Sequence, residues 1–417
     1  MIEWSEQHQQ IRTMFRRFVD KEIEPHVEAL EHGDMPPYDL LRKMLKTFGV
    51  HQMALGKFKK TIAREKEQQA AKERGEEPPE RKKRDKPTEE RAMEAAMRVI
   101  PVIELCRHSP GMITALGVSV GLTPSAIMSR GTIAQKERWV PDLLTMDKIG
   151  AWAISEPGSG SDAFGAMSSS ARPDGEGGFI LNGSKTFITN GPYADTIVFI
   201  CKYDDGSPAK ERKVVQFVLE KGMPGLTQSK PLRKMGLHAS PTGLLYLEDV
   251  RVGKEYLLGE TLDAKSGRKD AKATFTTERV GVAPMALGII EQCMKLCVDY
   301  ARTRVQFGKP IGEFQLVQLK LAKMEVARMN IQNLVFRQIE MAAHGRDMSL
   351  AEASACKLYS AQAAMDVCLE AVQLFGGNGY MAEYKVEQLC RDAKVLQIFG
   401  GTDEIQVTHI ARDLLRE

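Results

Sequence analysis

Residues 152–162 read WAISEPGSGSD, an apolar run that changes abruptly into a carboxylate, a proline and two glycines interleaved with serines. Trp152 and Ile154 alternate with small alanines, as the residues of a half-buried strand do. Pro157 and the glycines after it free the backbone to direct N–H groups and hydroxyls at a ligand. By itself the pattern also suits an ordinary surface connection, so its meaning depends on the segments around it.

Strand-like segments continue after this stretch as far as Gly259. Residues 179–189 read FILNGSKTFIT, two apolar runs joined by Asn182-Gly183, a pair favoured in two-residue hairpin turns. TIVFICK, KVVQFVLE and GLLYLEDV follow, rich in β-branched residues and separated by Gly, Pro, Asp and Lys. These runs predict a small antiparallel barrel or sandwich.

Segments with helical spacing flank the strands on both sides. Apolar residues recur at three- and four-residue steps over 7–50, 90–143, 316–343 and 350–375, and helical spacing resumes from about Thr274. A chain that runs from helices to strands and back to helices forms segregated layers and not βαβ units. We therefore predict an α+β fold with an N-terminal α-helical domain at 1–148, a central β-domain at 149–264 and a C-terminal α-helical domain at 265–417.

The segment 57–91 is dense in charge and contains Pro78, Pro79 and Pro87. Such a composition is typical of a mobile, solvated insertion, and we expect at most a polar helix broken at Pro78-Pro79. Its basic runs KFKK and RKKRDK also motivate the hypothesis that it contacts a partner or a membrane surface.

The composition excludes several classes of protein. Of the 417 residues, 43% are hydrophobic and 27% are charged, which is near the average for soluble globular proteins. No apolar run approaches the ~20 residues of a membrane span, so we expect no membrane insertion. A net charge of +3, without a recognition motif, argues against nucleic acid as a partner. The start MIEWSEQHQQ resembles neither a secretory signal nor a transit peptide, so we expect a cytoplasmic location.

The seven cysteines form no CxxC pair. Cys293 and Cys297 are four residues apart in an apolar helical pattern, which favours buried thiols over a metal pair. We expect neither a structural metal nor disulfides. A Rossmann dinucleotide site is also disfavoured, because no GxGxxG motif follows a strand and opens a helix.

Five blocks of the sequence together resemble the acyl-CoA dehydrogenase family. They are WAISEPGSGSD, GSKTFITNG (183–191), YARTRVQFGKPIGEFQ (300–315), LFGGNGY (374–380) and RDAKVLQIFGGTDEIQ (391–406), in the family's order and approximate spacing. The resemblance covers most of the chain but leaves 57–91 without a counterpart. It implies a central antiparallel β-barrel, a C-terminal four-helix bundle, an FAD cofactor and the α,β-desaturation of an acyl-CoA thioester to a trans-2-enoyl thioester.

The resemblance also implies which residues hold the FAD. Trp152, Ile154 and Ser155 are expected beside the flavin ring, and Phe187 and Thr189 on its opposite face. The alternative for Phe187 is a plain core aromatic. The pyrophosphate and adenine are expected to meet Arg304 and Phe307 of a neighbouring subunit, and Gln373, Gly376 and Gly377 of another segment. Further expected cofactor contacts are Gly160, Ser161, Thr402 and Glu404.

The position of the catalytic base departs from the commonest family pattern. Many members carry the carboxylate immediately before the Gly-Thr of the last block, where this chain has Gly400. The isovaleryl-type and long-chain-type branches place it on a C-terminal helix before an arginine, and TTERVGV has Glu278 there. We assign the base to Glu278, whose side chain can enter the space that Gly400 leaves. Burial would raise its pKa above the usual ~4.3. The alternative is an exposed residue at a helix start.

Substrate contacts follow from the same resemblance. The backbone N–H of Gly400 is expected to bond the thioester oxygen, where fixed donors stabilise developing negative charge. Ser161, Arg279 and Phe399 are expected on the substrate side. Asp403 and Glu404 also suit the acidic first turn of the following helix.

The resemblance implies an electron-transfer flavoprotein as acceptor and a homo-oligomer, a dimer of dimers, because its FAD contacts cross a subunit boundary. Two alternatives stay open: a flavoprotein of the same fold with oxygenase or nitroalkane-type chemistry, and a non-catalytic subunit of a heteromer. Anaerobic bleaching of the flavin by acyl-CoA separates the first alternative from a dehydrogenase, and FAD content tests the second. The sequence does not determine acyl chain length or branching.

Overall fold

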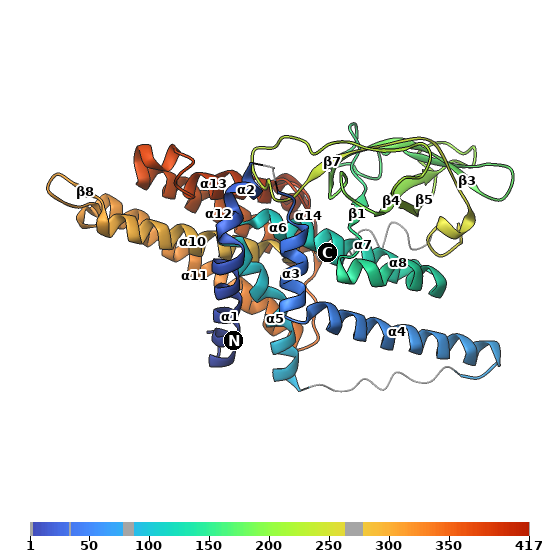
Figure 1. The fold of residues 1–417 in the computed structure, drawn as a ribbon, viewed down its shortest axis with the longest axis horizontal. Coiled ribbons are helices and arrows are strands. Elements are labelled where there is room, and N and C mark those ends of the chain that lie inside the picture. Colours follow the sequence, from blue (N-terminus) through green and yellow to red (C-terminus); the bar gives the residue numbers. More distant parts are fainter. Residues whose placement is uncertain (1–2, 33–34, 78–86, 263–277, 417) are drawn as a thin grey trace.

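The computed structural model describes residues 3–32, 35–77, 87–262 and 278–416, with the central sheet lying between two helical parts in chain order (Figure 1). The sheet lies toward one end of the long axis, and the hairpin of β8 (Val305–Gln306) and β9 (Lys309–Pro310) lies at the other end. This order confirms the predicted α+β fold.

The helices before the sheet begin at clear capping signals. Ser5 Oγ accepts a hydrogen bond from His8 N at 3.3 Å at the start of α1, and Thr132 and Gln135 form a capping box at the start of α8. A π-helical turn at Gly117–Leu122 separates α6 from α7. The described helices of this part are α1 (Glu6–Glu22), α2 (Val27–Glu31), α3 (Tyr38–Thr47), α4 (Val50–Glu73), α5 (Thr88–Cys106), α6 (Pro110–Leu116), α7 (Thr123–Arg130) and α8 (Ile133–Thr145).

Helix α4 corrects the prediction of a mobile, solvated insertion at 57–91. It packs along α8 and buries Phe58 and Ile62, four residues apart on one face. Two ion pairs join the helices: Lys66–Glu137 at 2.7 Å and Lys136–Glu65 at 2.8 Å. The expected polar helix is confirmed as far as Glu73, but the expectation of a solvated segment is wrong there, because two apolar side chains at helical spacing pack against the protein. Residues 78–86, with Pro78-Pro79, lie outside the described residues.

The strands between residues 150 and 252 form one sheet in the order β1-β4-β2-β3-β7-β6, and β5 also pairs with β4. Most pairs are antiparallel, as predicted, but β1 and β2 each run parallel to β4. The long connections between these strands permit parallel pairing, which a tight hairpin does not. The strands are β1 (Gly150–Ala153), β2 (Ser170–Pro173), β3 (Phe179–Thr189), β4 (Thr196–Tyr203), β5 (Val214–Glu220), β6 (Leu226–Gln228) and β7 (Thr242–Val252).

Asn182-Gly183 is not the predicted hairpin turn. β3 runs straight through it, and the pairing with β7 shifts register between Leu181 and Gly183. Gly183 has φ of 147°, and a Cβ there would lie 2.3 Å from Ser169 Oγ. The glycine is therefore needed for a β-bulge and a close approach of β2, which short-range sequence cannot distinguish from a turn.

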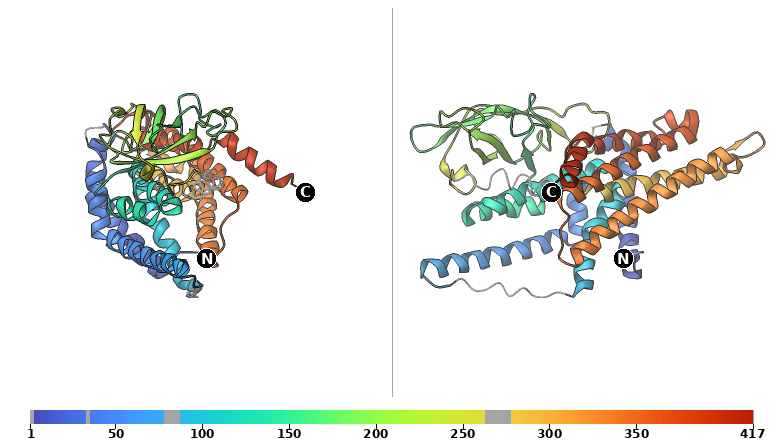
Figure 2. Two further views of the ribbon diagram at one scale, coloured as in Figure 1. Left: turned by 90° about the vertical axis from the view of Figure 1, so that its right-hand side faces the viewer. Right: turned by 180° about the vertical axis from the view of Figure 1, so that it is seen from behind.

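Helix α10 is the centre of the C-terminal part and packs on α5, α11 and α12. Gly288 allows its contact with α5, since a Cβ there would lie 2.2 Å from Ile103 O. Cys293 and Cys297 are buried in it as free thiols, as predicted. α14 projects away from the body of the chain (Figure 2). The helices are α10 (Val282–Thr303), α11 (Gln315–Ala343), α12 (Leu350–Phe375), α13 (Val386–Lys394) and α14 (Asp403–Leu414).

Two helical stretches, Pro110–Arg130 and Glu278–Thr303, have the length and hydropathy of a membrane span. The second is 67% buried, as the central helix of a packed domain is, and the first lies against β1 through its π-helical turn. Core helices of this kind pass the same test, so the finding is weak evidence for a membrane span.

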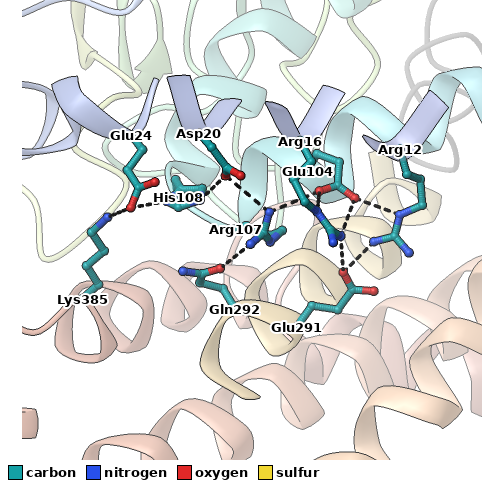
Figure 3. Close-up of polar contacts among 10 residues, drawn as sticks. All are labelled: Arg12, Arg16, Asp20, Glu24, Glu104, Arg107, His108, Glu291, Gln292 and Lys385. Atoms are coloured by element: carbon teal, nitrogen blue, oxygen red, sulfur yellow. Dashed lines mark hydrogen bonds and ion pairs between the residues drawn. The ribbon is translucent and has the colours of Figure 1, made fainter. Parts of the chain in front are cut away.

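A buried ion-pair network ties α1 to α5 and α10 (Figure 3). The fully buried carboxylate of Glu104 accepts hydrogen bonds from Arg12 Nε at 2.8 Å and Arg16 Nε at 2.9 Å. Arg12 also donates to Glu291 of α10 at 2.6 Å. Burial by itself would raise the pKa of Glu104, but the two arginines outweigh it and hold that pKa below its ordinary value. The network therefore holds the N-terminal helix against the C-terminal core.

Glu104→Gln is expected to lower the free energy of unfolding by about 3 kcal/mol at neutral pH, because Arg12 and Arg16 lose a shared buried carboxylate. The folded pKa of Glu104 is lowered, so its contribution is present above the ordinary value of 4.5 and is lost as pH falls through the folded pKa. Urea unfolding at pH 7 measures the cost. Glu137→Gln, which breaks the exposed pair with Lys66, is the control and should cost about 1 kcal/mol or less. Equal costs would contradict the role of the network.

Candidate functional site

The side chain of Glu278 lies against Gly400. Residues 278–280 are helical and lead through Gly281 into α10. A Cβ built at Gly400 would lie 3.5 Å from both Cγ and Cδ of Glu278. Glu278 is half-buried, so it is not the exposed helix-start residue of the alternative interpretation. The carboxylate from the helix thus borders the space that a side chain at position 400 would enter, as the sequence predicts.

Arg279 fixes the backbone beside this carboxylate. It is buried, and its Nε donates to Gly400 O at 3.2 Å while Nη1 donates to Ser354 Oγ of α12 at 3.2 Å. Gln406 Nε2 donates to Gly400 O at 3.1 Å and Gly401 O at 2.7 Å. Gly400 and Gly401 have φ of 63° and 90°, a left-handed turn that glycine adopts readily. Arg279, expected on the substrate side, is therefore a clamp on the turn.

Burial raises the pKa of Glu278 to about 7, although the positive charges of Arg279 and Lys357 lower it in part. A carboxylate with a pKa near 7 is suited to accept a proton at neutral pH, because it is a stronger base than an ordinary glutamate and is still substantially ionised. Perturbed pKa values of this kind are typical of functional sites.

The two blocks expected on opposite faces of the flavin lie side by side at the ends of β1 and in β3. Thr186 N donates to Ser155 O at 2.9 Å, which brings the chain after Trp152 and Ile154 next to Phe187. Phe187 is 71% exposed with φ of 57°, so it is not a core aromatic. Left-handed backbone at a non-glycine residue is strained and is found preferentially at ligand sites.

The carboxylate within WAISEPGSGSD has a structural role. Glu156 is buried and pairs at 2.8 Å with Lys185 Nζ, which also donates to Ile154 O at 3.0 Å. Its other hydrogen bonds come from Ser168 and Ser169 of the loop. Burial would raise the pKa of Glu156, but Lys185 and these donors lower it to about 2. The pair fixes the segment that follows β1 to β3.

The remaining expected contacts of this region are exposed or half-buried. Gly160 and Ser161 are exposed, and Thr189 and Phe399 are half-buried. Thr402 is the residue before α14, and Glu404 is exposed in its first turn. A hydrogen bond from the Thr402 side chain holds the pKa of Glu404 below its ordinary value. Glu404 therefore fits the acidic helix-start interpretation.

The residues expected at the pyrophosphate and adenine lie away from β1 and β3. They are Arg304, Phe307, Gln373, Gly376 and Gly377. Phe307 is 93% exposed on the β8–β9 hairpin, far along the long axis from β3 (Figure 1). Tyr300, one turn before Arg304, stacks on Phe375 at 4.1 Å between ring centres. The two sets expected at the pyrophosphate and adenine are thus brought together, but away from the ring-side set of the same chain.

These residues suit the parts of an FAD. The half-buried ring of Trp152 and the exposed ring of Phe187 suit the flavin ring. Apart from the chain neighbours, no described heavy atom lies within 4 Å of a Cβ built at Gly376 or Gly377. Open glycine backbone lets N–H groups approach phosphate closely, and Arg304 supplies a fork of donors.

A group of metal-ligand type lies elsewhere in the described residues, at Asp20, Glu24 and His108, whose ligand atoms are within 4.8 Å of one another. Lys385 already binds Glu24 at 2.6 Å, and Arg107 lies 3.6 Å from Asp20 (Figure 3). These cations neutralise the carboxylates, so we assign no metal to the group.

Sequence reasoning missed two parts of the site. Lys357 is fully buried in α12 and pairs with Asp403 at 2.9 Å; its only signal was a lone lysine within ASACKLYSAQAA. The π-helical turn Gly117–Leu122 lies against β1, where Gly150 N donates to Ser119 Oγ at 2.9 Å. Its signal was an apolar run without a polar face, ITALGVSVGL. π-Helical turns often mark functional sites.

Glu278→Gln is expected to change stability in a pH-dependent way. The folded pKa of Glu278, about 7, exceeds its ordinary value of 4.5, so its favourable contribution is present below pH 4.5 and is lost as pH rises through 7. Glutamine does not titrate and so does not lose this contribution. Relative to the wild type, the free energy of unfolding of the variant should therefore increase by roughly 2–3 kcal/mol between pH 5 and pH 8. Thermal unfolding at both pH values measures the gain.

Asp205→Asn is the matched control for this experiment. The Asp205 carboxylate is exposed and hydrogen bonds from Ser207 lower its pKa, so it is ionised in both states over this pH range and the difference from wild type should be flat. A flat difference for Glu278→Gln as well would show that its carboxylate is not desolvated.

Comparisons with known proteins agree with this arrangement. Residues 5–57, 151–250 and 265–415 match the family models described as the N-terminal, middle and C-terminal domains of acyl-CoA dehydrogenase. The chain is 39% identical to a short-chain specific acyl-CoA dehydrogenase of Megasphaera elsdenii, over 76% of this chain and 81% of that protein. It is 36% identical to an acyl-CoA dehydrogenase of Bacillus subtilis, over 97% of each.

Among solved structures, butyryl-CoA dehydrogenase from Megasphaera elsdenii is similar over the full length of both chains, with a TM-score of 0.81 and 31% identity. The segment 57–91 falls almost entirely between the matched N-terminal and middle domains.

Proposed function

The chain belongs to the acyl-CoA dehydrogenase family, as an oxidoreductase with FAD as its cofactor, and from this premise we propose that it desaturates an acyl-CoA thioester to the trans-2-enoyl thioester with Glu278 as the base. The observation that carries the proposal is the contact between Glu278 and Gly400. A carboxylate with a raised pKa borders the position where many relatives carry theirs.

Glu278 removes the proton at Cα of the thioester. FAD supplies the acceptor for the hydride that leaves Cβ. The partly buried carboxylate attracts the acidified Cα–H more strongly than a solvated one, because burial disfavours its charged form and proton uptake relieves that cost. The proton then resides on a Glu278 oxygen, from which it must return to solvent before the next turnover.

The turn at Gly400 supports the negative charge that develops on the thioester oxygen. Arg279 and Gln406 hold Gly400 O, which fixes the backbone of the glycine whose N–H is the proposed donor. A donor fixed before the reaction costs no reorganisation during it, and one such donor is worth about 3–4 kcal/mol. Glycine at position 400 supplies this N–H as well as any other residue would.

We also infer that the FAD lies between two copies of the chain and that the protein is a homo-oligomer. The β8–β9 hairpin that carries Phe307 lies at one end of the long axis, well away from β1 and β3 (Figure 1), so one FAD can meet both Phe307 and the ring-side residues only with a second copy. Large exposed apolar side chains on α11 support such an interface: Leu316, Leu319, Val326 and Met329. An electron-transfer flavoprotein is the proposed acceptor, and a cytoplasmic location stays a proposal.

Glu278→Gln is expected to slow anaerobic flavin bleaching about 10²- to 10⁴-fold, the usual contribution of a general base. Butyryl-, isovaleryl- and octanoyl-CoA are the probes, followed by loss of the oxidised flavin absorbance. Asp205→Asn, which changes an exposed carboxylate after β4, serves as the control and should bleach at the wild-type rate. Bleaching of the wild type by none of a wider acyl-CoA panel would refute the desaturation, and rapid bleaching of Glu278→Gln would refute the assignment of the base.

Phe307→Ala is expected to lower the FAD bound per chain several-fold, because the ring would no longer cover the cofactor of a second copy. Absorbance at the flavin and protein bands measures occupancy, and far-ultraviolet circular dichroism checks that the helices are intact. Met53→Ala, which removes a side chain that is 61% exposed on α4, is the control and should keep full occupancy. Unchanged FAD content in Phe307→Ala would argue against the shared site.

A further inference from the structure

Lys357 is a buried cation in the middle of an otherwise small and apolar helix face. Its side chain is fully buried, and its Nζ lies 2.9 Å from Asp403 Oδ1. Removing an ammonium group from water costs several kcal/mol, so a buried lysine needs compensation by its surroundings. Neighbours of Lys357 on α12, such as Ala353, Ala361 and Ala364, are buried alanines that need no such cation for packing.

The partner of Lys357 connects it to the catalytic turn. Asp403 is the first residue of α14 and follows Gly400 and Gly401. Gln362, also on α12, donates to Asp403 Oδ2 at 3.4 Å. Helix α12 therefore holds the C-terminal side of the turn through Asp403.

One helical turn earlier in the chain, α12 also holds the N-terminal side of the Gly400–Gly401 turn. Ser354 Oγ accepts a hydrogen bond from Arg279 at 3.2 Å, and Arg279 donates to Gly400 O at 3.2 Å. Ser354 and Lys357 are three residues apart and so share a face of α12. These contacts link α12 to both sides of the turn: Ser354 through Arg279 to Gly400, and Lys357 to Asp403. Glu278 lies against Gly400 within this set of contacts.

Lys357 also acts on Glu278 directly. Burial raises the pKa of Glu278, and the charges of Arg279 and Lys357 oppose that rise. The charges that act on the carboxylate are Arg279 from its own helix and Lys357 from α12. Burial lowers the pKa of Lys357, and Arg279 adds to this, while Asp403 and Glu404 of α14 favour its charged form and oppose the decrease.

We propose that Lys357 is a positioning residue for the reaction: it anchors the Gly400 turn through Asp403 and places a buried positive charge that favours the ionised form of Glu278. The inference rests on the proposed function of Glu278 as the base. Helix α12 carries no group that reacts, but through Lys357 it influences the fraction of Glu278 that is ionised and can accept a proton.

Lys357→Gln separates the charge from the contact, because the amide can still donate to Asp403. We expect the acid limb of the pH profile of anaerobic flavin reduction to move upward by about one pH unit, the lower end of the effect of a nearby opposite charge. Well above that limb the rate should return to the wild-type value, since Glu278 is then ionised in both proteins. A purely structural role would lower the rate at every pH and leave the limb in place.

Lys136→Met is the matched control, because Lys136 is a buried lysine paired with Glu65 at 2.8 Å in the contact of α8 with α4. The acid limb of the pH profile of Lys136→Met should coincide with that of the wild type. Lys357→Arg, which restores the charge, should move the limb back toward the wild-type position. A Lys357→Gln profile with an unmoved limb would overturn the inference.

A second measurement uses the FAD-bound protein without substrate. Stability gained by Glu278→Gln between pH 5 and pH 8 should be larger in a Lys357→Gln background than in the wild type, because Glu278 loses an attracting charge. Equal gains in both backgrounds would overturn the inference even if no acyl-CoA probe bleached the flavin. If Glu278→Gln bleached normally, the proposed function would fail; if it did not bleach but both Lys357 readouts were unchanged, only the role of Lys357 would fail.

Discussion

Desolvation of one carboxylate, that of Glu278, is the constraint on which the rest of the catalytic region depends. A partly buried carboxylate is poorly stabilised as an anion, so nearby positive charge decides how far its pKa rises. Gly400 provides the room for it, and Arg279 and Lys357 provide the charge. These cations are themselves buried and need partners, which the Gly400 carbonyl and Asp403 supply. The contacts that compensate the charges of Arg279 and Lys357 thereby connect α10, α12 and α14.

Two other buried carboxylates, those of Glu156 and Glu104, show the opposite outcome, whereas the pKa of Glu31 is raised to about 8 by burial and by the negative charge of Asp392. Glu156 accepts hydrogen bonds from Lys185 and two serines, and its pKa falls to about 2. Glu104 is held by two arginines, and its pKa is also lowered. Glu278 has attracting charges nearby, yet burial outweighs them and its pKa is raised to about 7. In Glu156 and Glu104 the hydrogen bonds and charges that favour the ionised form outweigh burial, and in Glu278 burial outweighs the attracting charges.

The architecture explains why the helices and the sheet must be held in one arrangement. The ring-side residues Trp152 and Phe187 belong to the sheet, the base to the helical part after it, and the junction is fixed by buried polar contacts. Asn190 Nδ2 donates to Ala115 O at 2.9 Å and to Gly150 O at 3.0 Å, joining α6 to β1. The β8–β9 hairpin, proposed to meet the rest of the FAD, lies away from β1 and β3, and we propose that a second copy completes the site.

Local pattern in the sequence determined the order of helices and strands and the limits of α12, because periodicity is a property of neighbouring residues. The assignment of Glu278 and of the flavin-side blocks follows from the resemblance of short motifs to the family and stays a prediction. Only the tertiary structure decided that Asn182-Gly183 is a bulge, that α4 packs on α8, that β1 and β2 run parallel to β4, and that Lys357 and Asp403 belong to the site. Each of these depends on a contact between segments distant in the chain. Whether a charge is buried, and what compensates it, is set by such contacts and leaves little trace in local sequence.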